Sequence, residues 1–529
     1  MTARQMFWSG WGDPAQTPAL PAQALELLRG ALGVRGPTPA VAVEDVRLPR
    51  ARLGERERHM LSQIVGPEHV RVDDRSRLLH TRGKSTTDLL RIRSGEANDA
   101  PDAVVCPISH QHVVELLTAC SQARLAVVPF GGGTSVVGGL APRRDAFRAV
   151  IALDVGRMDK LLELDRESRT ATLEPGLRGP EAEALLAESG YTIGHFPQSF
   201  PYASLGGFAA ARSSGQASAG YGRFDERVVA LRVATPQGTI EVGRAPKSAA
   251  GPDLRQLFLG SEGGFGVITA IRVEVGPFPQ ARAYEGWRFG SFAAGCAAMR
   301  RLAQDGPLPT VLRLSDEAET AVNLAPRAQL GDGGGSGGAL AITGYEGTTG
   351  EVERRRDDVS SLMRAHAAEP DPAAGAAWFD RRFEGPYLRD ALLDAGALVE
   401  TLETATFWSG TERLYRAVGE ALRTTLTDLG TPPVVLCHVS HVYRSGASLY
   451  FTVAAAQLED PVAQWSTAKA AASDAILAAG GSITHHHGVG IDHREHYWRE
   501  VGPLAIEALR AVKATLDPVG ILNPGVLLP

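Results

Sequence analysis

Three consecutive histidines, His485, His486 and His487, are the first residues whose types and spacing suggest chemistry. They stand in Gly-Gly-Ser-Ile-Thr-His-His-His-Gly-Val-Gly, residues 480–490. Because imidazole titrates near neutral pH, such a cluster can transfer protons at a reacting centre. Side chains alternate in an extended stretch, so we expect His485 and His487 on one face and His486 on the other. Purely structural histidines are the alternative; with no cysteine or acidic cluster nearby in the sequence, we predict no metal.

One tyrosine and two arginines elsewhere also carry groups that can act on a substrate. Tyr450 lies in Ser-Leu-Tyr-Phe-Thr, 35 residues before His485. Arg313 lies in Val-Leu-Arg-Leu-Ser-Asp, and Arg389 in Pro-Tyr-Leu-Arg-Asp. By residue type alone, a tyrosine in a strand is most often a packing residue, and an arginine in such a position most often forms an ion pair on the surface. These three residues therefore gain a role only from further context.

Three glycine-rich loops could bind a ligand through main-chain groups rather than side chains. In the first, residues 129–136, consecutive amide N–H groups can form a nest for a pyrophosphate. In the second, residues 194–222, small residues are dense enough to lie flat against a planar ring system. In the third, residues 260–269, the main chain can bind an adenine or ribityl edge. A tight turn explains each loop alone, but the three in this order predict a cofactor site.

The residues of these loops that we expect to bind the cofactor are Pro129, Gly131, Gly132, Gly133, Thr134, Ser135, Val136, Gln198, Ser199, Ser204, Leu205, Gly206, Gly207, Ser214, Gly215, Tyr221, Gly222, Glu262, Gly263, Gly266, Val267 and Ile268.

Alternating strands and helices are expected to position the loops. A strand at 104–107, a helix at 110–123 and a strand at 125–129 lead into the first loop as an α/β unit. Short strands then alternate with turns over 148–275, with a helix at 179–189. The first 100 residues, rich in Arg and Pro, are predicted to form an extended or helical arm around a larger body.

Beyond Pro277 the pattern changes to longer helices and paired strands. The apolar spacing predicts helices at 289–302, 351–365, 411–429 and 461–479, and strands at 311–314, 340–345, 434–443 and 448–454. Residues 331–338, Gly-Asp-Gly-Gly-Gly-Ser-Gly-Gly, are predicted to be a flexible insert, and the stretch before Pro386 to be irregular.

Composition excludes several classes of protein. The 529 residues exceed one hydrophobic core, so two or three domains are expected. With 54 Lys+Arg against 60 Asp+Glu the net charge is −6, which argues against nucleic acid as a partner. Four dispersed cysteines without a Cys-x-x-Cys pair favour a reducing cytoplasm. No apolar run approaches the roughly 18 residues of a membrane span.

The order of the motifs resembles a known family. Gly-Gly-Gly-Thr-Ser-Val, then Ser-x-Gly-Gly, then Gly-Ser-Glu-Gly-x-x-Gly-Val-Ile-Thr is similar to the FAD-binding domain of the vanillyl-alcohol-oxidase type. Within that superfamily the chain resembles the alkyldihydroxyacetonephosphate synthases of ether-lipid synthesis. The likeness covers almost the whole chain, in segments at 8–12, 131–136, 190–195, 204–207, 227–229, 235–238, 251–253 and 517–518.

The resemblance implies an α+β fold and the cofactor FAD. A two-part FAD-binding α/β domain of the vanillyl-alcohol-oxidase type is expected at 95–275. A cap domain, an antiparallel sheet flanked by helices, is expected at 276–500. Residues 1–94 would form the N-terminal arm or helical region, and 501–529 a C-terminal segment returning to the FAD domain. Because Thr134 follows the glycines where covalent members carry histidine, FAD is expected to be held non-covalently.

The resemblance also implies roles for the reactive residues. Tyr450 would remove a proton beside the carbonyl of acyl-dihydroxyacetone phosphate, the fatty acid would leave, and a fatty alcohol would replace it without net electron transfer. Nearby cations or the flavin would have to lower the phenol pKa, which is ordinarily about 10. The three histidines would move protons, and Arg313 and Arg389 would bind a phosphate and a carboxylate.

Two other functions stay open. In an FAD-dependent dehydrogenase of a 2-hydroxy acid such as D-lactate, the arginines would bind the carboxylate and a histidine would accept the hydroxyl proton. A flavin-binding scaffold without activity would need none of the reactive side chains, so their presence argues against it.

Departures from the family leave the substrate less determined than the cofactor. Gln198 replaces an acidic residue and Phe265 stands where Leu is usual. Neither end carries a recognisable peroxisomal address and no signal-peptide pattern is visible. We therefore expect a cytoplasmic protein with a lipid-like or small anionic substrate. A peripheral membrane contact stays open, and a homodimer is expected from resemblance alone.

Overall fold

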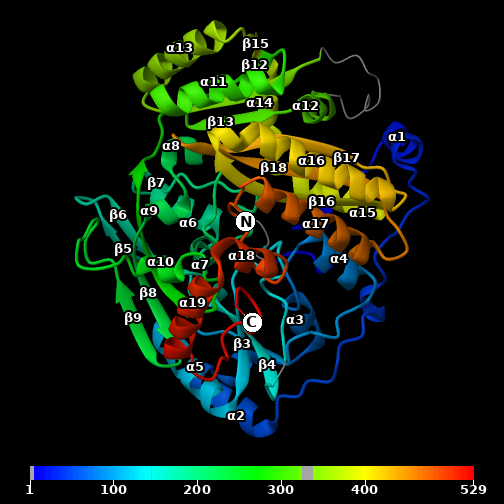
Figure 1. Cartoon of the computed structure of the whole chain (residues 1–529). Helices are drawn as coiled ribbons and strands as arrows, with labels where there is room; N and C mark the ends of the chain where they lie inside the picture. Colours follow the sequence, from blue (N-terminus) through cyan, green and yellow to red (C-terminus); the bar gives the residue numbers. More distant parts are fainter. Residues whose placement is uncertain (1–4, 145, 325–336, 529) are drawn as a thin grey trace.

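The computed structural model describes residues 5–144, 146–324 and 337–528. In Figure 1 a seven-stranded sheet with its helices occupies the upper part, and the sheets around the glycine loops occupy the lower part. The predicted flexible insert at 331–338 lies almost entirely outside the described residues.

A four-stranded sheet of order β1-β2-β4-β3 carries the first glycine loop. Its strands are β1 (Val70–Arg71), β2 (Ala103–Val105), β3 (Leu125–Phe130) and β4 (Ala149–Asp154). Strands β2 and β3 run parallel to β4, and helix α5 (His110–Ala123) makes the crossover. Strands β2, β3 and β4 are buried on both faces, which explains their continuous apolar sequence. The predicted α/β unit is confirmed, and the loop begins where β3 ends.

A five-stranded antiparallel sheet of order β5-β6-β10-β8-β9 holds the other two loops. Its strands are β5 (Leu161–Asp165), β6 (Thr170–Leu173), β8 (Val228–Thr235), β9 (Gly238–Val242) and β10 (Val267–Glu274). Its short helices are α6 (Gly179–Ala187), α7 (Leu205–Ala210), α8 (Ser218–Tyr221), α9 (Phe224–Arg227) and α10 (Arg255–Phe258). A two-stranded ladder joins β7 (Tyr191–Thr192) to β11 (Gly276–Pro277).

The seven-stranded sheet is antiparallel throughout, with order β15-β12-β14-β13-β17-β18-β16. Its strands are β12 (Ala281–Phe289), β13 (Val311–Ser315), β14 (Ala339–Gly347), β15 (Glu369–Asp371), β16 (Ala397–Phe407), β17 (Val434–Val442) and β18 (Gly446–Ala456).

One face of this sheet packs on helices α11 (Phe292–Asp305), α13 (Thr349–Ala365), α16 (Thr411–Asp428) and α17 (Pro461–Ala478), which share a single apolar core with it. On the opposite face α14 (Pro372–Arg381) packs against Leu340 and Ile342. Helices α12 (Glu317–Leu324) and α15 (Gly385–Asp394) border β17 and β16. Because side chains alternate along a strand, residues next to the core residues point away from the helices.

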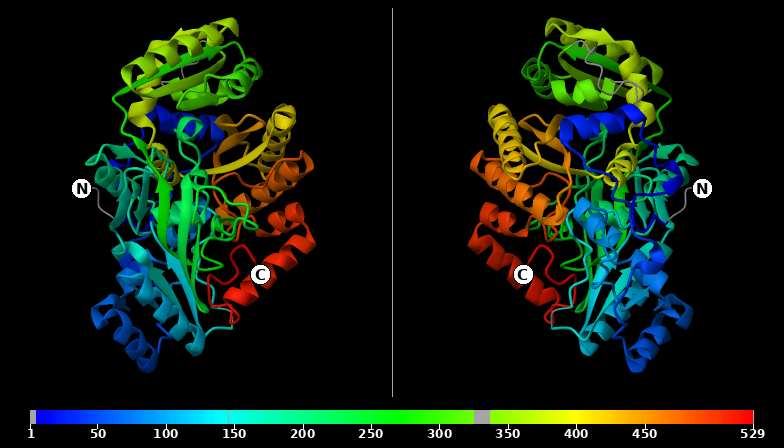
Figure 2. Two further views of the ribbon diagram at one scale, coloured as in Figure 1. Left: turned by 90° about the vertical axis from the view of Figure 1, so that its left-hand side faces the viewer. Right: turned by 90° about the vertical axis from the view of Figure 1, so that its right-hand side faces the viewer.

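The N-terminal region spans both parts of the molecule (Figure 2). Helix α1 (Ala22–Leu32) packs beside β16 and β18, and α2 (Glu55–Val65) packs on α5. Helix α3 (Asp74–Leu79) lies by β2, and α4 (Thr86–Arg93) contacts α17 and β16. At the other end, α18 (Arg494–Val501) and α19 (Pro503–Leu516) pack on the core of the five-stranded sheet.

After α19 the chain adds a bridge between Leu522 and Val127 of β3. The end of the chain therefore lies against β3 of the four-stranded sheet. None of the described helices combines the length and apolar character needed to cross a bilayer.

Candidate active site

A row of polar side chains crosses the seven-stranded sheet on the face opposite α11, α13, α16 and α17. Tyr450 of β18 is paired in register with His438 of β17 and Glu403 of β16. The neighbours of each in its own strand, such as Leu449 and Phe451, lie in the helix-covered core. The ring of His438 stacks on that of Tyr450, with centroids 4.8 Å apart. Strand pairing therefore brings Tyr450 to a polar face.

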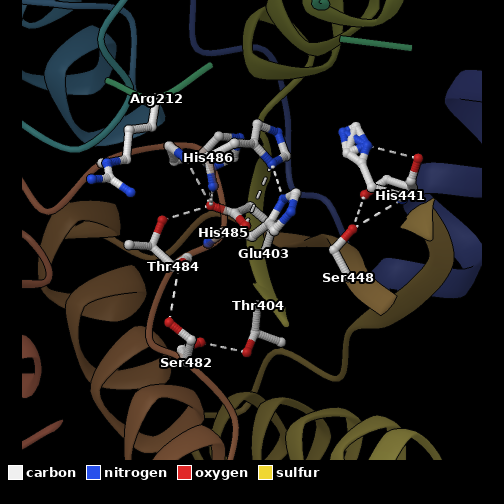
Figure 3. A network of polar contacts seen from close by, with 12 residues as sticks. Arg212, Glu403, Thr404, His441, Ser448, Ser482, Thr484, His485 and His486 are labelled. Atoms are coloured by element: carbon white, nitrogen blue, oxygen red, sulfur yellow. Dashed lines mark hydrogen bonds and ion pairs between the residues drawn. The ribbon is translucent and has the colours of Figure 1, made fainter. Parts of the chain in front are cut away.

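The histidine triplet reaches this row because Glu403 binds its main chain. Glu403 Oε2 accepts from the N–H of His485 at 2.6 Å, and Oε1 accepts from those of His486 and His487 at 3.0 and 2.8 Å. The Thr484 hydroxyl donates to Oε1 at 2.7 Å. Figure 3 shows these contacts converging on the carboxylate. Although burial opposes ionisation, the pKa of Glu403 lies well below its usual value, because the carboxylate attracts His486, His487 and His485 whenever they are protonated and accepts a hydrogen bond from Thr484.

The sequence-based prediction of alternating histidine faces is wrong. Residues 485–487 form bends rather than a strand, because one carboxylate accepts hydrogen bonds from their three consecutive N–H groups. The rings of His485 and His486 therefore meet, with Nδ1 atoms 2.9 Å apart. The His486 ring also lies 6.2 Å from that of Tyr450 and 4.8 Å from that of His487. The triplet and Tyr450 therefore lie next to each other, and their shared role stays a prediction.

Burial keeps the proton-carrying groups neutral. It lowers the pKa of His485 well below the ordinary value, lowers that of His486, and lowers that of His487 to about 3. Burial raises the pKa of Tyr450 to about 12; Thr401 and Arg313 act in the opposite direction. The protein alone therefore does not lower the Tyr450 pKa as base catalysis would require, contrary to what the sequence led us to expect of its neighbours.

The two predicted arginines lie at different edges of the site. Arg313 of β13 shares the polar face, and its Nη2 lies 2.5 Å from Glu319 Oε1 and 3.1 Å from His438 Nδ1. It is thus linked through His438 to Tyr450. Arg389 of α15 instead pairs with its neighbour Asp390 and donates to the main-chain oxygen of Lys84 at 2.7 Å.

Asp390 in turn accepts from the N–H of Trp11. Arg389 therefore lies where the N-terminal region meets the seven-stranded sheet, and no contact joins it to the triplet among the described residues.

The first and second glycine loops pack directly on each other. A β-carbon on Gly131 would lie 2.2 Å from Ser204 Oγ, and one on Gly132 would lie 2.4 Å from the main-chain oxygen of Tyr202. Within the described chain, the N–H groups of Gly132, Gly133 and Thr134 find no hydrogen-bond acceptor. Three consecutive free donors beside a hydroxyl fit the pyrophosphate of a dinucleotide such as FAD.

The third glycine loop links the first to the histidines. Burial raises the pKa of Glu262 to about 7, and its Oε2 accepts from the N–H groups of Val489 and Gly490 at 3.0 and 2.8 Å. A β-carbon on Gly263 would lie 2.7 Å from Pro129. The third loop thus connects the first loop to the segment that follows the triplet.

Other predicted cofactor residues serve the contact between the two parts. The phenol of Tyr221 donates to Glu346 of β14 at 2.8 Å, and its ring fills the space beside Gly194. Gln198 is exposed, and the main-chain oxygen of Ser199 accepts from Tyr202 and Ala203. No feature of these residues points to the pyrophosphate.

One group of histidines has a geometry that could hold a metal. The ligand atoms of His441, His485 and His486 lie within 4.8 Å of one another. Two of these atoms already share a hydrogen bond, and the Arg223 guanidinium lies 3.1 Å from His485 Nε2, where its charge would repel a cation. The prediction of no metal stays a prediction.

Glu403, Arg223, Tyr443 and His438 were not identified from the sequence. For Glu403 the available signal was an acidic residue within the β-branched run Thr-Leu-Glu-Thr-Ala-Thr. The other three carry no spacing that separates them from ordinary surface or packing residues.

Comparisons with known proteins agree with this site. A family model described as FAD binding domain matches residues 101–243, and one described as FAD linked oxidases, C-terminal domain, matches residues 278–527. The chain therefore contains an FAD-binding domain of the vanillyl-alcohol-oxidase type, and its cofactor is FAD.

The relatives identify the family. The alkyldihydroxyacetonephosphate synthase of Dictyostelium discoideum is 32% identical, over 99% of this chain and 94% of that protein. A solved structure of an alkyldihydroxyacetonephosphate synthase superposes with a TM-score of 0.81 at 29% identity, covering 98% of each chain. The mitochondrial D-lactate dehydrogenase [cytochrome] of Arabidopsis thaliana is 28% identical over 82% of this chain and 74% of that protein. The chain thus belongs to the alkyldihydroxyacetonephosphate synthase family of FAD-linked enzymes.

Proposed function

We propose that this protein exchanges the acyl group of acyl-dihydroxyacetone phosphate for a fatty alcohol, with non-covalently bound FAD. The observation that carries the proposal is the placement of Tyr450 beside the histidine triplet, on a face that the glycine loops approach. FAD, when bound, supplies an electron-poor ring system that can act as an electron sink. The same placement would serve other substrates poorly if they lacked an acidic C–H bond.

In this reaction Tyr450 takes the proton beside the substrate carbonyl. Its phenol starts protonated, since burial raises its pKa to about 12. It must therefore lose its own proton before it acts. The Thr401 side chain hydrogen-bonds to it, and the ring of His486 lies 6.2 Å away between centroids. Arg313, whose charge lowers the Tyr450 pKa, favours the phenolate.

Arg313 and Arg389 are the proposed anion-binding residues. Both already pair with carboxylates, Arg313 with Glu319 and Arg389 with Asp390. Such a paired guanidinium retains further N–H donors for a phosphate or a carboxylate. We assign Arg313 to the anion nearer Tyr450, because His438 links the two side chains.

The experiment is product analysis by mass spectrometry. Yellow protein receives palmitoyl-dihydroxyacetone phosphate and a labelled long-chain alcohol without any electron acceptor, beside a Tyr450→Phe variant. Labelled alkyl product with free palmitate, lost in the variant, supports the proposal. Exchange undiminished in Tyr450→Phe would refute the role of Tyr450. Lack of exchange, together with rapid flavin bleaching by D-lactate, would instead favour the 2-hydroxy-acid dehydrogenase.

We further propose a cytoplasmic protein that contacts membranes peripherally and forms a homodimer. The membrane contact is supported by the lipid character of the proposed substrates. Sedimentation with phospholipid vesicles tests the contact, and light scattering during gel filtration tests the dimer. Protein that stays in the supernatant, or elutes as a monomer, would refute the corresponding part.

A further inference from the structure

Arg223 connects the FAD-binding half to the histidine triplet, and every nitrogen of its guanidinium is hydrogen-bonded. It directly precedes α9, and its Nε donates to Asp225 Oδ1 at 2.9 Å. Its Nη2 donates to the main-chain oxygen of Arg212 at 2.9 Å. Its Nη1 lies 3.1 Å from both the main-chain oxygen and Nε2 of His485. Every nitrogen of the guanidinium thus has a partner, and its position is fixed.

The contact with Arg223 determines which nitrogen of His485 carries a proton. A guanidinium can only donate hydrogen bonds, so His485 Nε2 must accept. The Tyr443 hydroxyl lies 2.6 Å from the same Nε2 and can donate to it as well. Burial and the neighbouring cation hold the His485 pKa well below its ordinary value, so the ring is neutral. Its single proton is then on Nδ1.

This tautomer fixes that of the next histidine. His485 Nδ1 lies 2.9 Å from His486 Nδ1, and only one of these atoms can carry the shared proton. Because His485 donates, His486 Nδ1 accepts. The pKa of His486 is also lowered by burial, so its ring is neutral and its own proton is on Nε2. His486, whose ring lies beside that of Tyr450, therefore presents an N–H group rather than a lone pair.

We infer that Arg223 and Tyr443 are positioning residues that set the tautomers of His485 and His486, so that His486 acts as a proton donor fed through a chain of three groups. The role in catalysis rests on the proposed exchange reaction. As His486 gives its Nε2 proton to the departing carboxylate, its Nδ1 takes the proton of His485 Nδ1. His485 Nε2 takes the proton of Tyr443, and both imidazoles end neutral.

The phenolate left on Tyr443 lies within reach of the Arg223 charge. Burial raises the Tyr443 pKa, whereas the charge of Arg223 and its hydrogen bond act in the opposite direction. The proton that the alcohol loses when it replaces the fatty acid restores the phenol through the same chain in reverse. Atoms and charge therefore balance over one exchange, and no oxidant or reductant is needed.

The first test reads the tautomers directly and does not depend on the substrate. Long-range ¹H–¹⁵N correlation spectra of histidine-labelled, FAD-loaded protein distinguish protonated from unprotonated ring nitrogens. His485→Gln and His486→Gln variants assign the two sets of signals. We expect a protonated Nδ1 on His485 and a protonated Nε2 on His486. A protonated Nε2 on His485 would overturn the inference, whatever the substrate proves to be.

Variants then separate the hydrogen bond from simple charge. Arg223→Lys keeps a group that only donates and should keep the tautomers. Arg223→Gln offers an oxygen as well as an amide, so both tautomers should appear in the spectra. Arg212→Gln removes a nearby charge that does not contact His485, and should leave the spectra unchanged. Identical spectra for Arg223→Gln and wild type would refute the role of Arg223.

Tyr443→Phe tests the proton supply while Arg223 stays in place. We expect unchanged tautomers and an exchange rate reduced about 100-fold, the lower range for loss of general acid catalysis. An unchanged rate would refute the chain of three groups. Expected tautomers in a wild-type protein that performs no exchange would leave the positioning intact and refute the proposed function instead.

Discussion

Replacing Glu403 by glutamine tests whether the buried carboxylate builds the active site. The carboxylate accepts four hydrogen bonds, three from consecutive N–H groups of the triplet and one from Thr484. A glutamine has one acceptor oxygen, and its amide nitrogen must face donors. If the oxygen replaces Oε1, the N–H of His485 loses its acceptor; in the other orientation, three donors lose theirs.

The cost follows from these contacts. Each buried donor left unpaired costs about 1–3 kcal/mol, and loss of the charge weakens the remaining bonds by about half. Together these changes amount to about 3–5 kcal/mol, the range for breaking a buried charged contact. At about 1.4 kcal/mol per tenfold, the ordered loop becomes about 100- to 4,000-fold less populated. Because the pKa of Glu403 lies well below its usual value, mild acid would not mimic the substitution.

We therefore expect Glu403→Gln to lose at least about 100-fold in alcohol exchange while it stays folded and yellow. Exchange rate, flavin absorbance and circular dichroism are measured on the same preparation. The matched control is Glu400→Gln, three residues earlier in β16: its carboxylate is equally buried but accepts from the N–H of Thr86. A folded Glu403→Gln protein with exchange within about threefold of wild type would refute our view of Glu403.

Two further predictions concern the cofactor loop and acid stability. Gly132→Ala should weaken FAD binding at least about tenfold in fluorescence titrations, because its β-carbon would lie 2.4 and 2.7 Å from main-chain atoms of Tyr202 and Ala203. The control variant Gly276→Ala, whose β-carbon would have no atom within 4 Å, should bind FAD normally. Equal FAD affinities of the two variants would contradict the packing argument. Burial lowers the pKa of His195 to about 3, so its neutral form contributes stability that is present above about pH 6.5 and lost as the pH falls toward 3. In urea titrations below about pH 6, the unfolding free energy of wild type should fall by about 1.4 kcal/mol per pH unit relative to that of His195→Gln. If the unfolding free energies of the two proteins change in parallel with pH, His195 is not buried as a neutral ring.

The sequence predicted those parts of the fold in which local signals agree. Helix α5 was predicted with its observed ends because its apolar residues recur at helical spacing, and in the structure Ser109 caps it. Strands β8 and β17 to β18 were predicted for their apolar and β-branched content. The three glycine loops, Tyr450 and the triplet were all selected before any geometry was known. Tyr450, the triplet and the third loop lie near one another in the structure, and their roles stay predictions.

The missing elements share one physical cause. Strand β16 was not predicted, because two glutamates three residues apart suggest a surface or a helix, whereas both are buried. A carboxylate inside a sheet is stable only when donors from a distant loop satisfy it, and no local pattern reports those donors. Strand β12 and helix α14 were also missed, because each depends on tertiary packing in the outer part of the seven-stranded sheet. Arg223 was missed for the same reason, because its contacts in the triplet lie far away in the sequence.

The charges of the site favour group exchange over oxidation of a hydroxy acid. A base that accepts a hydroxyl proton must become charged, yet burial lowers the pKa of every histidine in the triplet and so disfavours an imidazolium. The permanent charges, in contrast, are paired or hydrogen-bonded: Arg313 with Glu319, Arg223 with Asp225, and Glu403 with the loop. Neutral groups in contact can pass a proton along without leaving an isolated buried charge, which would cost several kcal/mol. Besides the proton that Tyr450 takes from carbon, exchange of a fatty acid for an alcohol needs only such a transfer, and this is why we favour the synthase reaction for this chain.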